Sequence, residues 1–332
     1  MIRSLRSVPR LITFVGTGVL ALLAGCSTSG TARGTPAPGT HLQTTPLHYR
    51  WSTRTYLLHV PPTYDEQKAW PLVLALHGAF STASTFERCS GFSELADRAG
   101  FVVAYPNGIG LLGHLQHWNA GHCCGLAEKD HVDDVGFLRY VIRDVARQVR
   151  IDPQRIYVAG HSNGGMLAYE FASESSESIA AVCVVSGSIG SAVGKGREPC
   201  QTGPPQTAVP LLAIHGREDK TVPFAGGLGL RSGGRYYVSV FDSVSLWAHY
   251  GGCPPAPEIS GDPHGGPSTL TWRDARGEPQ AVLYVLDHWE HAWPGTLGTE
   301  DLPPDHPLRN FQAAPVIWDF FCQHPRSPSV RE

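Results

Sequence analysis

The sequence predicts an α/β protein: a mostly parallel, doubly wound sheet with helices on both faces. Strand-like and helix-like segments alternate along the chain, a pattern that favours a parallel sheet covered by helices. The strand candidates are continuous runs of Val, Leu, Ile and Ala, as expected for strands that are buried on both sides. A chain of 332 residues with 42% hydrophobic content can bury one large core.

The individual elements follow from the spacing of the apolar residues. Short apolar runs predict strands at residues 55–60, 71–77, 101–106, 155–160, 180–187, 209–216 and 281–287. Helical spacing predicts helices at residues 86–99, 132–149, 165–174, 238–250 and 314–322. No internal repeat interrupts this order, so we expect one doubly wound sheet.

The N-terminus is typical of an export signal. Residues 1–25 carry Arg3, Arg6 and Arg10, contain no acid, and include an apolar run too short to span a membrane comfortably. The letters "LAGC" that end at Cys26 resemble the bacterial lipobox, in which the Cys thiol is acylated. We therefore expect a lipoprotein signal peptide over 1–25, lipidation of Cys26, export to the cell envelope, and a lipid anchor at the outer face of the membrane. A plain signal peptide with an incidental Cys is the alternative.

The next segment differs from the rest in composition. Residues 26–40 are small, polar and rich in Pro and Gly, as in a flexible tether, so a single folded catalytic domain is expected over 41–332. The whole chain has a formal charge of −3, and the three arginines of the signal segment leave −6 on the part from Cys26 onward. A nucleic-acid partner is therefore not expected.

The stretch "RIYVAGHSNGGMLAYEF" places Ser162 between Gly160 and Gly164, where a predicted strand gives way to a predicted helix. G-x-S-x-G in this context is typical of the nucleophile elbow, a strained turn that exposes the serine hydroxyl. The pattern alone is weak in a chain with 37 glycines, and a Gly-rich phosphate loop is the alternative. A phosphate loop would also be expected to carry a Lys after its glycines, and none follows here.

A serine hydroxyl needs a histidine to take its proton and a carboxylate to orient that histidine. In this type of fold the chain order is Ser, then Asp or Glu, then His. The loop after the strand at 209–216 offers Glu218 and Asp219, and the loop after 281–287 offers His288 and His291. All four follow the carboxyl ends of predicted strands, where open α/β sheets bind ligands, so spacing leaves both choices open.

Four blocks together carry a family resemblance: "LHGAFSTASTF", "SNGGMLAY", "HGREDKTVPF" and "HAWPG". They resemble the α/β-hydrolase esterases of the polyhydroxybutyrate depolymerase and feruloyl esterase group, including mycobacterial lipoprotein esterases, and they occur in matching order. The resemblance implies that Ser162 is the nucleophile, Asp219 the acid and His291 the base. An oxyanion hole would then use the backbone N–H groups of Asn163, which follows the nucleophile, and of Ala79 in the "HGAF" turn.

The stretch "HLQHWNAGHCCGLAEKDH" contains His114, His117, His122 and His131 beside Cys123 and Cys124 and could suggest zinc. We expect no metal and no organic cofactor, because zinc motifs usually space their cysteines and an exported protein meets oxidising conditions. The hydrolase group has a similar "WNAG.CCG" loop, and the resemblance implies a wall of the substrate cleft. Trp118 and Asn119 are the candidate substrate contacts there, with Trp289 or Trp293 as a further flat apolar wall.

The cysteine count leaves one thiol over. Eight cysteines less Cys26 leave seven, so at least one has no disulfide partner. They are Cys89, Cys123, Cys124, Cys183, Cys200, Cys253 and Cys322. Cys183 lies in a buried strand pattern and is the predicted free thiol. Cys253 with Cys322, and Cys89 with Cys123 or Cys124, are possible bridges.

Together these features predict a membrane-tethered serine carboxylesterase that forms an acyl-enzyme. The expected substrates are small esters with short-chain or aromatic acyl groups, carried for example on sugars or polysaccharides. The oligomeric state does not follow from the sequence. An acyltransferase acting on envelope sugars or alcohols, a polyhydroxyalkanoate depolymerase, a peptidase and a non-catalytic binding lipoprotein are the alternatives.

Overall fold

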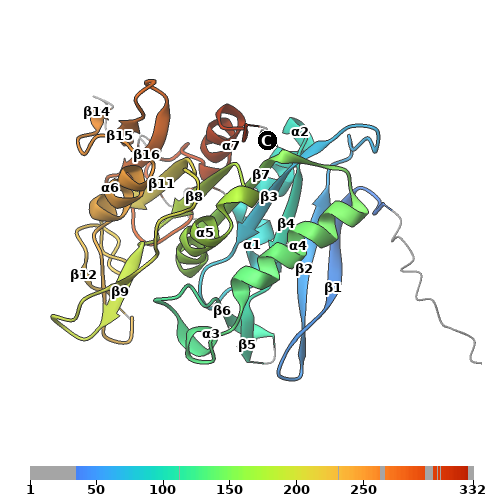
Figure 1. The fold of residues 1–332 in the computed structure, drawn as a ribbon, viewed down its shortest axis with the longest axis horizontal. Coiled ribbons are helices and arrows are strands. Elements are labelled where there is room, and N and C mark those ends of the chain that lie inside the picture. Colours follow the sequence, from blue (N-terminus) through green and yellow to red (C-terminus); the bar gives the residue numbers. More distant parts are fainter. Residues whose placement is uncertain are drawn as a thin grey trace, which may run out of the picture. The chain divides into compact units, whose positions relative to one another are not determined.

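The computed structural model describes residues 35–327 except 112, 231, 262–265, 296–301, 305 and 307. A ten-stranded sheet forms its centre (Figure 1). In spatial order its strands are β1 (Gly39–Tyr49), β2 (Ser52–Val60), β4 (Val102–Pro106), β3 (Trp70–Leu76), β7 (Ile151–His161), β8 (Ala181–Val185), β11 (Leu211–Gly216), β16 (Pro279–Leu286), β15 (Ser268–Arg273) and β14 (Glu258–Ser260). The strands from β4 to β16 are parallel, and the outer strands on either side are antiparallel. The predicted mostly parallel sheet is confirmed.

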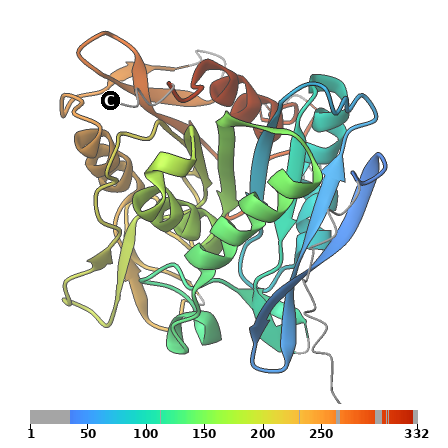
Figure 2. The same ribbon diagram turned by 45° about the vertical axis from the view of Figure 1, so that its right-hand side comes forward.

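Helices cover both faces of this sheet because its central strands are apolar on both sides. Along β3, Leu72 and Leu74 join one buried core while Val73 and Ala75 join the other. The first core lies under α4 (Asp134–Gln148), α5 (Asn163–Glu174) and α6 (Val240–Tyr250). The second lies under α1 (Ala83–Ser90), α2 (Phe92–Ala99) and α7 (Ala313–Gln323). In Figure 2 the green helices α4 and α5 lie in front of the sheet.

Two sequence predictions about the N-terminal half need correction. The helix predicted over 86–99 is two helices, α1 and α2, because Gly91 has φ +75° and interrupts the helical path between them. The tether predicted to end at residue 40 ends earlier, since Gly39 and Thr40 already pair with β2. β1 alternates partly buried and exposed residues at the edge of the sheet and has no apolar run to reveal it. The predicted signal peptide and Cys26 lie outside the described residues.

Two excursions from the main sheet form smaller elements of their own. After β4 the chain forms β5 (Ile109–Leu111), β6 (His114–His117) and α3 (Gly125–Lys129). Later segments form a four-stranded sheet from β10 (Cys200–Gln201), β9 (Gly190–Val193), β13 (Arg235–Tyr237) and β12 (Gly227–Leu228). A short 3-10 helix, Ser176–Ser178, follows α5.

A buried ion pair fastens the first excursion to the sheet. Arg54 of β2 lies 2.6 Å from Asp134 at the start of α4, and both side chains are almost fully buried. The other oxygen of Asp134 accepts a hydrogen bond from the backbone N–H of Asn119, at 2.7 Å. Removal of either charge would leave its partner buried and unpaired, which is strongly destabilising. The pair therefore holds the loop that follows β6 in place.

The cysteines pair differently from the sequence expectation. Cys123 and Cys124 form a disulfide with each other, so the proposed pairing of Cys89 with either of them is wrong. Cys253 and Cys322 both have free thiols, because Cys253 packs in the first core while Cys322 belongs to α7 on the opposite face of the sheet. Cys183 is buried and free, as predicted, and Cys200 is exposed and free.

Among the helices that the structure describes, none has both the length and the apolar character needed to cross a bilayer.

Candidate active site

A sharp turn between β7 and α5 presents Ser162. Its backbone has φ +54° and ψ −120°, an unfavourable conformation for a residue with a side chain. The helix starts so close to the strand that a Cβ on Gly160 would lie 2.2 Å from the carbonyl oxygen of Gly164. A Cβ on Gly164 would lie 2.4 Å from the carbonyl oxygen of His77. Glycine is therefore required on both sides of the serine, as the elbow pattern predicts.

Three side chains from separate parts of the sequence form one hydrogen-bonded chain. His291 Nε2 lies 2.8 Å from Ser162 Oγ, and His291 Nδ1 lies 2.7 Å from Asp219 Oδ2. The three residues follow β7, β11 and β16, whose carboxyl ends meet at one edge because these strands run parallel through β8. The structure thus brings together the three residues that the sequence suggested.

The carboxylate of Asp219 is buried but well solvated by protein groups. Its Oδ1 accepts hydrogen bonds from the backbone N–H groups of Thr221 and Val222, at 2.8 and 2.9 Å. Burial by itself would raise the pKa of Asp219, but His215 and His291 outweigh that effect and hold the pKa well below its usual range. Asp219 is therefore ionised at neutral pH.

The rival acid and base form a separate pair at the surface. His288 Nδ1 lies 2.9 Å from Glu218 Oε1, and the two side chains are 76% and 51% exposed. No hydrogen bond joins either of them to Ser162 within the described part of the chain. Of the alternatives that spacing left open, the geometry favours Asp219 and His291.

Two residues beside the serine have unbonded backbone N–H groups. Ala79 and Asn163 both line the cavity that contains Ser162. Among the described residues, no acceptor is bonded to the backbone N–H of either one. Free N–H groups beside a nucleophile are what an oxyanion hole requires.

A cavity of about 230 Å³ opens at Ser162. Its lining includes Phe80, His117, Cys124, Met166, Thr221, Val222, Arg235 and Tyr237. Arg235 and Tyr237 come from β13 of the small sheet, far from any catalytic motif, so no signal in the sequence marked them. Arg235 is held by Glu128 of α3, with Nη2 and Oε2 2.7 Å apart. The cavity wall is therefore assembled across the two excursions.

The three predicted substrate contacts do not line this cavity, and that prediction is corrected. Trp118 is fully buried, packs at a tilt against the ring of His77, and donates its indole N–H to the His77 carbonyl. Asn119 uses its amide to close its own loop, with bonds to Val132 and Gly121. Trp293 is 7% exposed and donates to the carbonyl of Ser90. All three side chains therefore form hydrogen bonds within the protein and do not face the cavity.

The histidines of the 114–131 stretch do not converge. His122 is buried against Ser191, His117 packs edge-on against Phe80, and His114 and His131 are exposed. In the part of the chain that the structure describes, no three His, Cys, Asp or Glu residues are close enough together to hold a metal ion.

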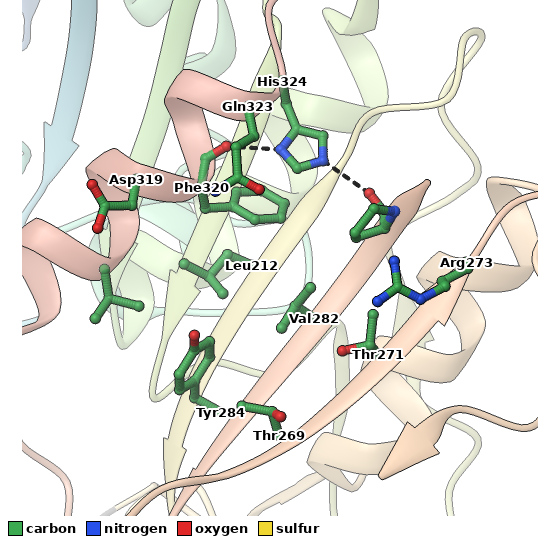
Figure 3. A pocket seen from close by; sticks show the side chains of 12 residues that line it. Leu212, Thr269, Thr271, Arg273, Val282, Tyr284, Asp319, Phe320, Gln323 and His324 are labelled. Carbon is green, nitrogen blue, oxygen red and sulfur yellow. Dashed lines mark hydrogen bonds between the residues drawn. The ribbon is translucent and has the colours of Figure 1, made fainter. Parts of the chain in front are cut away.

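Another cavity, of about 270 Å³, lies between α7 and the strands β15 and β16 (Figure 3). Figure 3 shows its apolar floor of Leu212 and Val282 and its polar rim of Arg273 and Asp319. Both ring nitrogens of His324 lie within hydrogen-bond distance of backbone carbonyls, Nδ1 of Phe320 and Nε2 of Pro279. No hydroxyl is bonded to an imidazole among its described lining residues, so the site at Ser162 is the stronger catalytic candidate.

The fold and the site together define an α/β-hydrolase. Residues 54–195 match the family model described as Esterase PHB depolymerase. The chain is 30% identical over 258 residues to "Putative esterase NocK" of Nocardia uniformis subsp. tsuyamanensis, which covers 73% of this chain and 71% of that protein. It is 29% identical over 208 residues to "Feruloyl esterase B" of Piromyces equi, covering 62% of this chain and 37% of that protein.

A solved structure supports the fold. "Acetyl xylan esterase from Aspergillus awamori" superposes with a TM-score of 0.54 at 16% identity, covering 79% of this chain and 97% of that one. The chain belongs to the esterase family described as Esterase PHB depolymerase, and the resemblance drawn from its motifs is confirmed. The protein is an esterase.

Three buried histidines around the site predict a loss of stability in acid. Burial lowers the pKa of His77 to about 4 and the pKa values of His122 and His161 to about 3. Below pH ~6.5 these histidines are protonated in the unfolded chain but stay neutral in the folded chain. As the pH falls, the free energy of unfolding therefore decreases, by up to ~1.4 kcal/mol per pH unit for each histidine. Thermal unfolding followed from pH 7 to pH 5 measures this slope.

His122→Gln should flatten that slope, because it removes one of the three buried imidazoles. A melting temperature that stays constant between pH 7 and pH 5 would contradict the assignment of these histidines as neutral.

Proposed function

We propose that this esterase is a serine carboxylesterase that hydrolyses short-chain or aromatic acyl esters through an acyl-enzyme. The observation that carries the proposal is the unbroken hydrogen-bonded chain from Ser162 through His291 to Asp219. A buried, ionised carboxylate orients the imidazole so that its Nε2 can accept the serine proton. The family gives the reaction class, and this geometry suggests how the chain performs it.

The proposed reaction has two halves. Ser162 Oγ attacks the ester carbonyl while its proton moves to His291 Nε2, and Asp219 stabilises the resulting imidazolium. The N–H groups of Ala79 and Asn163 bind the oxyanion. Collapse of the tetrahedral intermediate breaks the bond to the alcohol, which leaves with the proton from His291. A water molecule then repeats the sequence on the acyl-enzyme and releases the acid.

The cavity is assigned to the acyl group. It is lined by Ser162 and by both oxyanion donors, whereas His291 is not part of the lining. Because His291 delivers a proton to the alcohol oxygen, the alcohol must leave on the side of His291, and the acyl group must extend the other way. A volume of about 230 Å³ is below the ~300–1,000 Å³ usual for drug-sized ligands. It suits a short chain or a single ring.

Replacement of Ser162 tests the nucleophile. Ser162→Ala should lower kcat/KM for p-nitrophenyl acetate at least ~1,000-fold without unfolding the domain, because the hydrogen-bonded residues act as a unit. The matched control is Ser186→Ala, since Ser186 has nearly the same backbone φ, +53°, and is not bonded to His291. A Ser162→Ala enzyme within ~10-fold of wild type would contradict the proposal.

Acyl-chain selectivity tests the cavity assignment. Across p-nitrophenyl esters from acetate to palmitate, kcat/KM should fall as the chain lengthens. Methyl ferulate, whose acyl group carries a single ring, should be a substrate. Met166 is buried and lines the cavity, so Met166→Ala should shift the optimum to a longer chain. An optimum at palmitate in the wild-type enzyme would argue for a lipase instead.

We also propose export and lipid anchoring, with residues 1–25 removed, Cys26 acylated and the following residues acting as a tether to the catalytic domain. The support is the basic start, the apolar run and the "LAGC" letters. Wild-type protein should fractionate with membranes and enter detergent, and Cys26→Ser should appear in the soluble fraction. Cys200→Ser, which removes an exposed thiol of the folded domain, should stay with the membrane. Membrane retention of Cys26→Ser would place the anchor elsewhere.

A further inference from the structure

A second histidine contacts the proposed acid. His215 lies at the end of β11, four residues before Asp219, and its side chain is 1% exposed. Its Nε2 is 2.9 Å from the carbonyl oxygen of Val222 and 3.2 Å from Asp219 Oδ2. Both of these atoms are acceptors, so Nε2 must carry a hydrogen, which both oxygens attract.

We infer that His215 is a positioning residue for the esterase reaction: its Nε2–H closes the turn from Asp219 to Val222 and fixes the carboxylate that orients His291. This inference rests on the proposed function, in which Asp219 is the acid of the triad. It assigns a role to a residue that touches neither substrate nor serine.

The contacts of Asp219 show what His215 adds. Two backbone N–H groups from its own turn fix Oδ1. The other oxygen, Oδ2, bonds His291, and His215 approaches that same oxygen from the strand side. Without His215, the imidazole of His291 would be the one remaining side-chain contact of Oδ2 among the described residues. The side chains of His215 and Asp219 are both buried, where such polar contacts are stronger than in water.

His215 is itself held in place, unlike the other imidazole nearby. The hydrogen bond to Val222 and the edge of Phe224, 6.1 Å away between ring centroids, fix the ring of His215. His161 packs against His291 with ring centroids 5.2 Å apart. Its Nε2 is buried and has no hydrogen-bond partner among the described residues. His161 can provide a packing surface, whereas His215 can set the position of a carboxylate.

Loss of His215 could also lower activity in a second way, through the cavity wall. Val222 also lines the acyl cavity, so loss of the His215 hydrogen bond could move the cavity wall instead of the acid. A shifted wall would change KM and the preference between acyl groups. A displaced carboxylate would lower kcat for every ester by the same factor, because His291 serves them all.

The experiment compares His215→Gln, His215→Asn and His215→Leu. Gln can place an amide N–H near the position of Nε2, Asn is the same group on a shorter arm, and Leu has no donor. We expect Asn and Leu to lower kcat ~10-fold or more with KM within ~2-fold, equally for acetate and butyrate esters, and Gln to stay within ~3-fold of wild type. If the Leu variant fails to fold, the Gln and Asn pair decides.

A cycle with Asp219→Asn tests whether His215 acts through the acid. In that background, His215→Asn should cause little further loss, because a positioning residue has nothing left to position. The inference is overturned if His215→Asn has wild-type kcat, if Gln is as poor as Leu, if the loss is confined to KM or one acyl group, or if the two losses multiply. Full activity of Asp219→Asn alone would overturn the acid assignment of the proposed function as well.

Discussion

The close approach of α5 to the sheet at Ser162 is the constraint on which the site depends. The helix begins directly after the serine, and the space between strand and helix admits only hydrogen atoms at Gly160 and Gly164. The backbone N–H of Ser162 is bonded to the carbonyl of Val185 in the next strand, at 2.8 Å. Tight packing and this bond together hold a residue at positive φ, where an isolated chain would rarely stay. Other parts of the fold bring His291 and Asp219 to Ser162.

Those partners reach Ser162 because the central strands are parallel. Their carboxyl ends share one edge, so loops that are distant in sequence converge there. The acid loop adds its own rigidity, since Asp219 is bonded to two backbone groups of its turn and contacts His215. Burial that would penalise a lone carboxylate is offset by these donors. The hydrogen bonds that offset the burial of Asp219 therefore also hold its carboxylate in position at this edge of the sheet.

Two ion pairs hold the segments around the site in place. Arg54 and Asp134 secure the loop after β6, and Arg235 and Glu128 join the small sheet to α3. The tryptophans of this region pack behind the site and hold backbone carbonyls.

Much of this architecture could be predicted from local patterns. Apolar runs located the buried strands, and the glycines around Ser162 indicated the elbow, because both signals depend on neighbouring residues alone. Edge strand β1 and the break at Gly91 were missed, since partial burial and one residue's backbone angle leave little trace in composition. The sequence alone thus determined the fold class and a short set of catalytic candidates. Spacing left Asp219 and Glu218 open, the family motif indicated Asp219, and the tertiary structure places Asp219 beside His291. Only the tertiary structure shows that Trp118 is buried away from the cavity and that Tyr237 lines it, because both depend on which side chain faces inward after distant segments have packed.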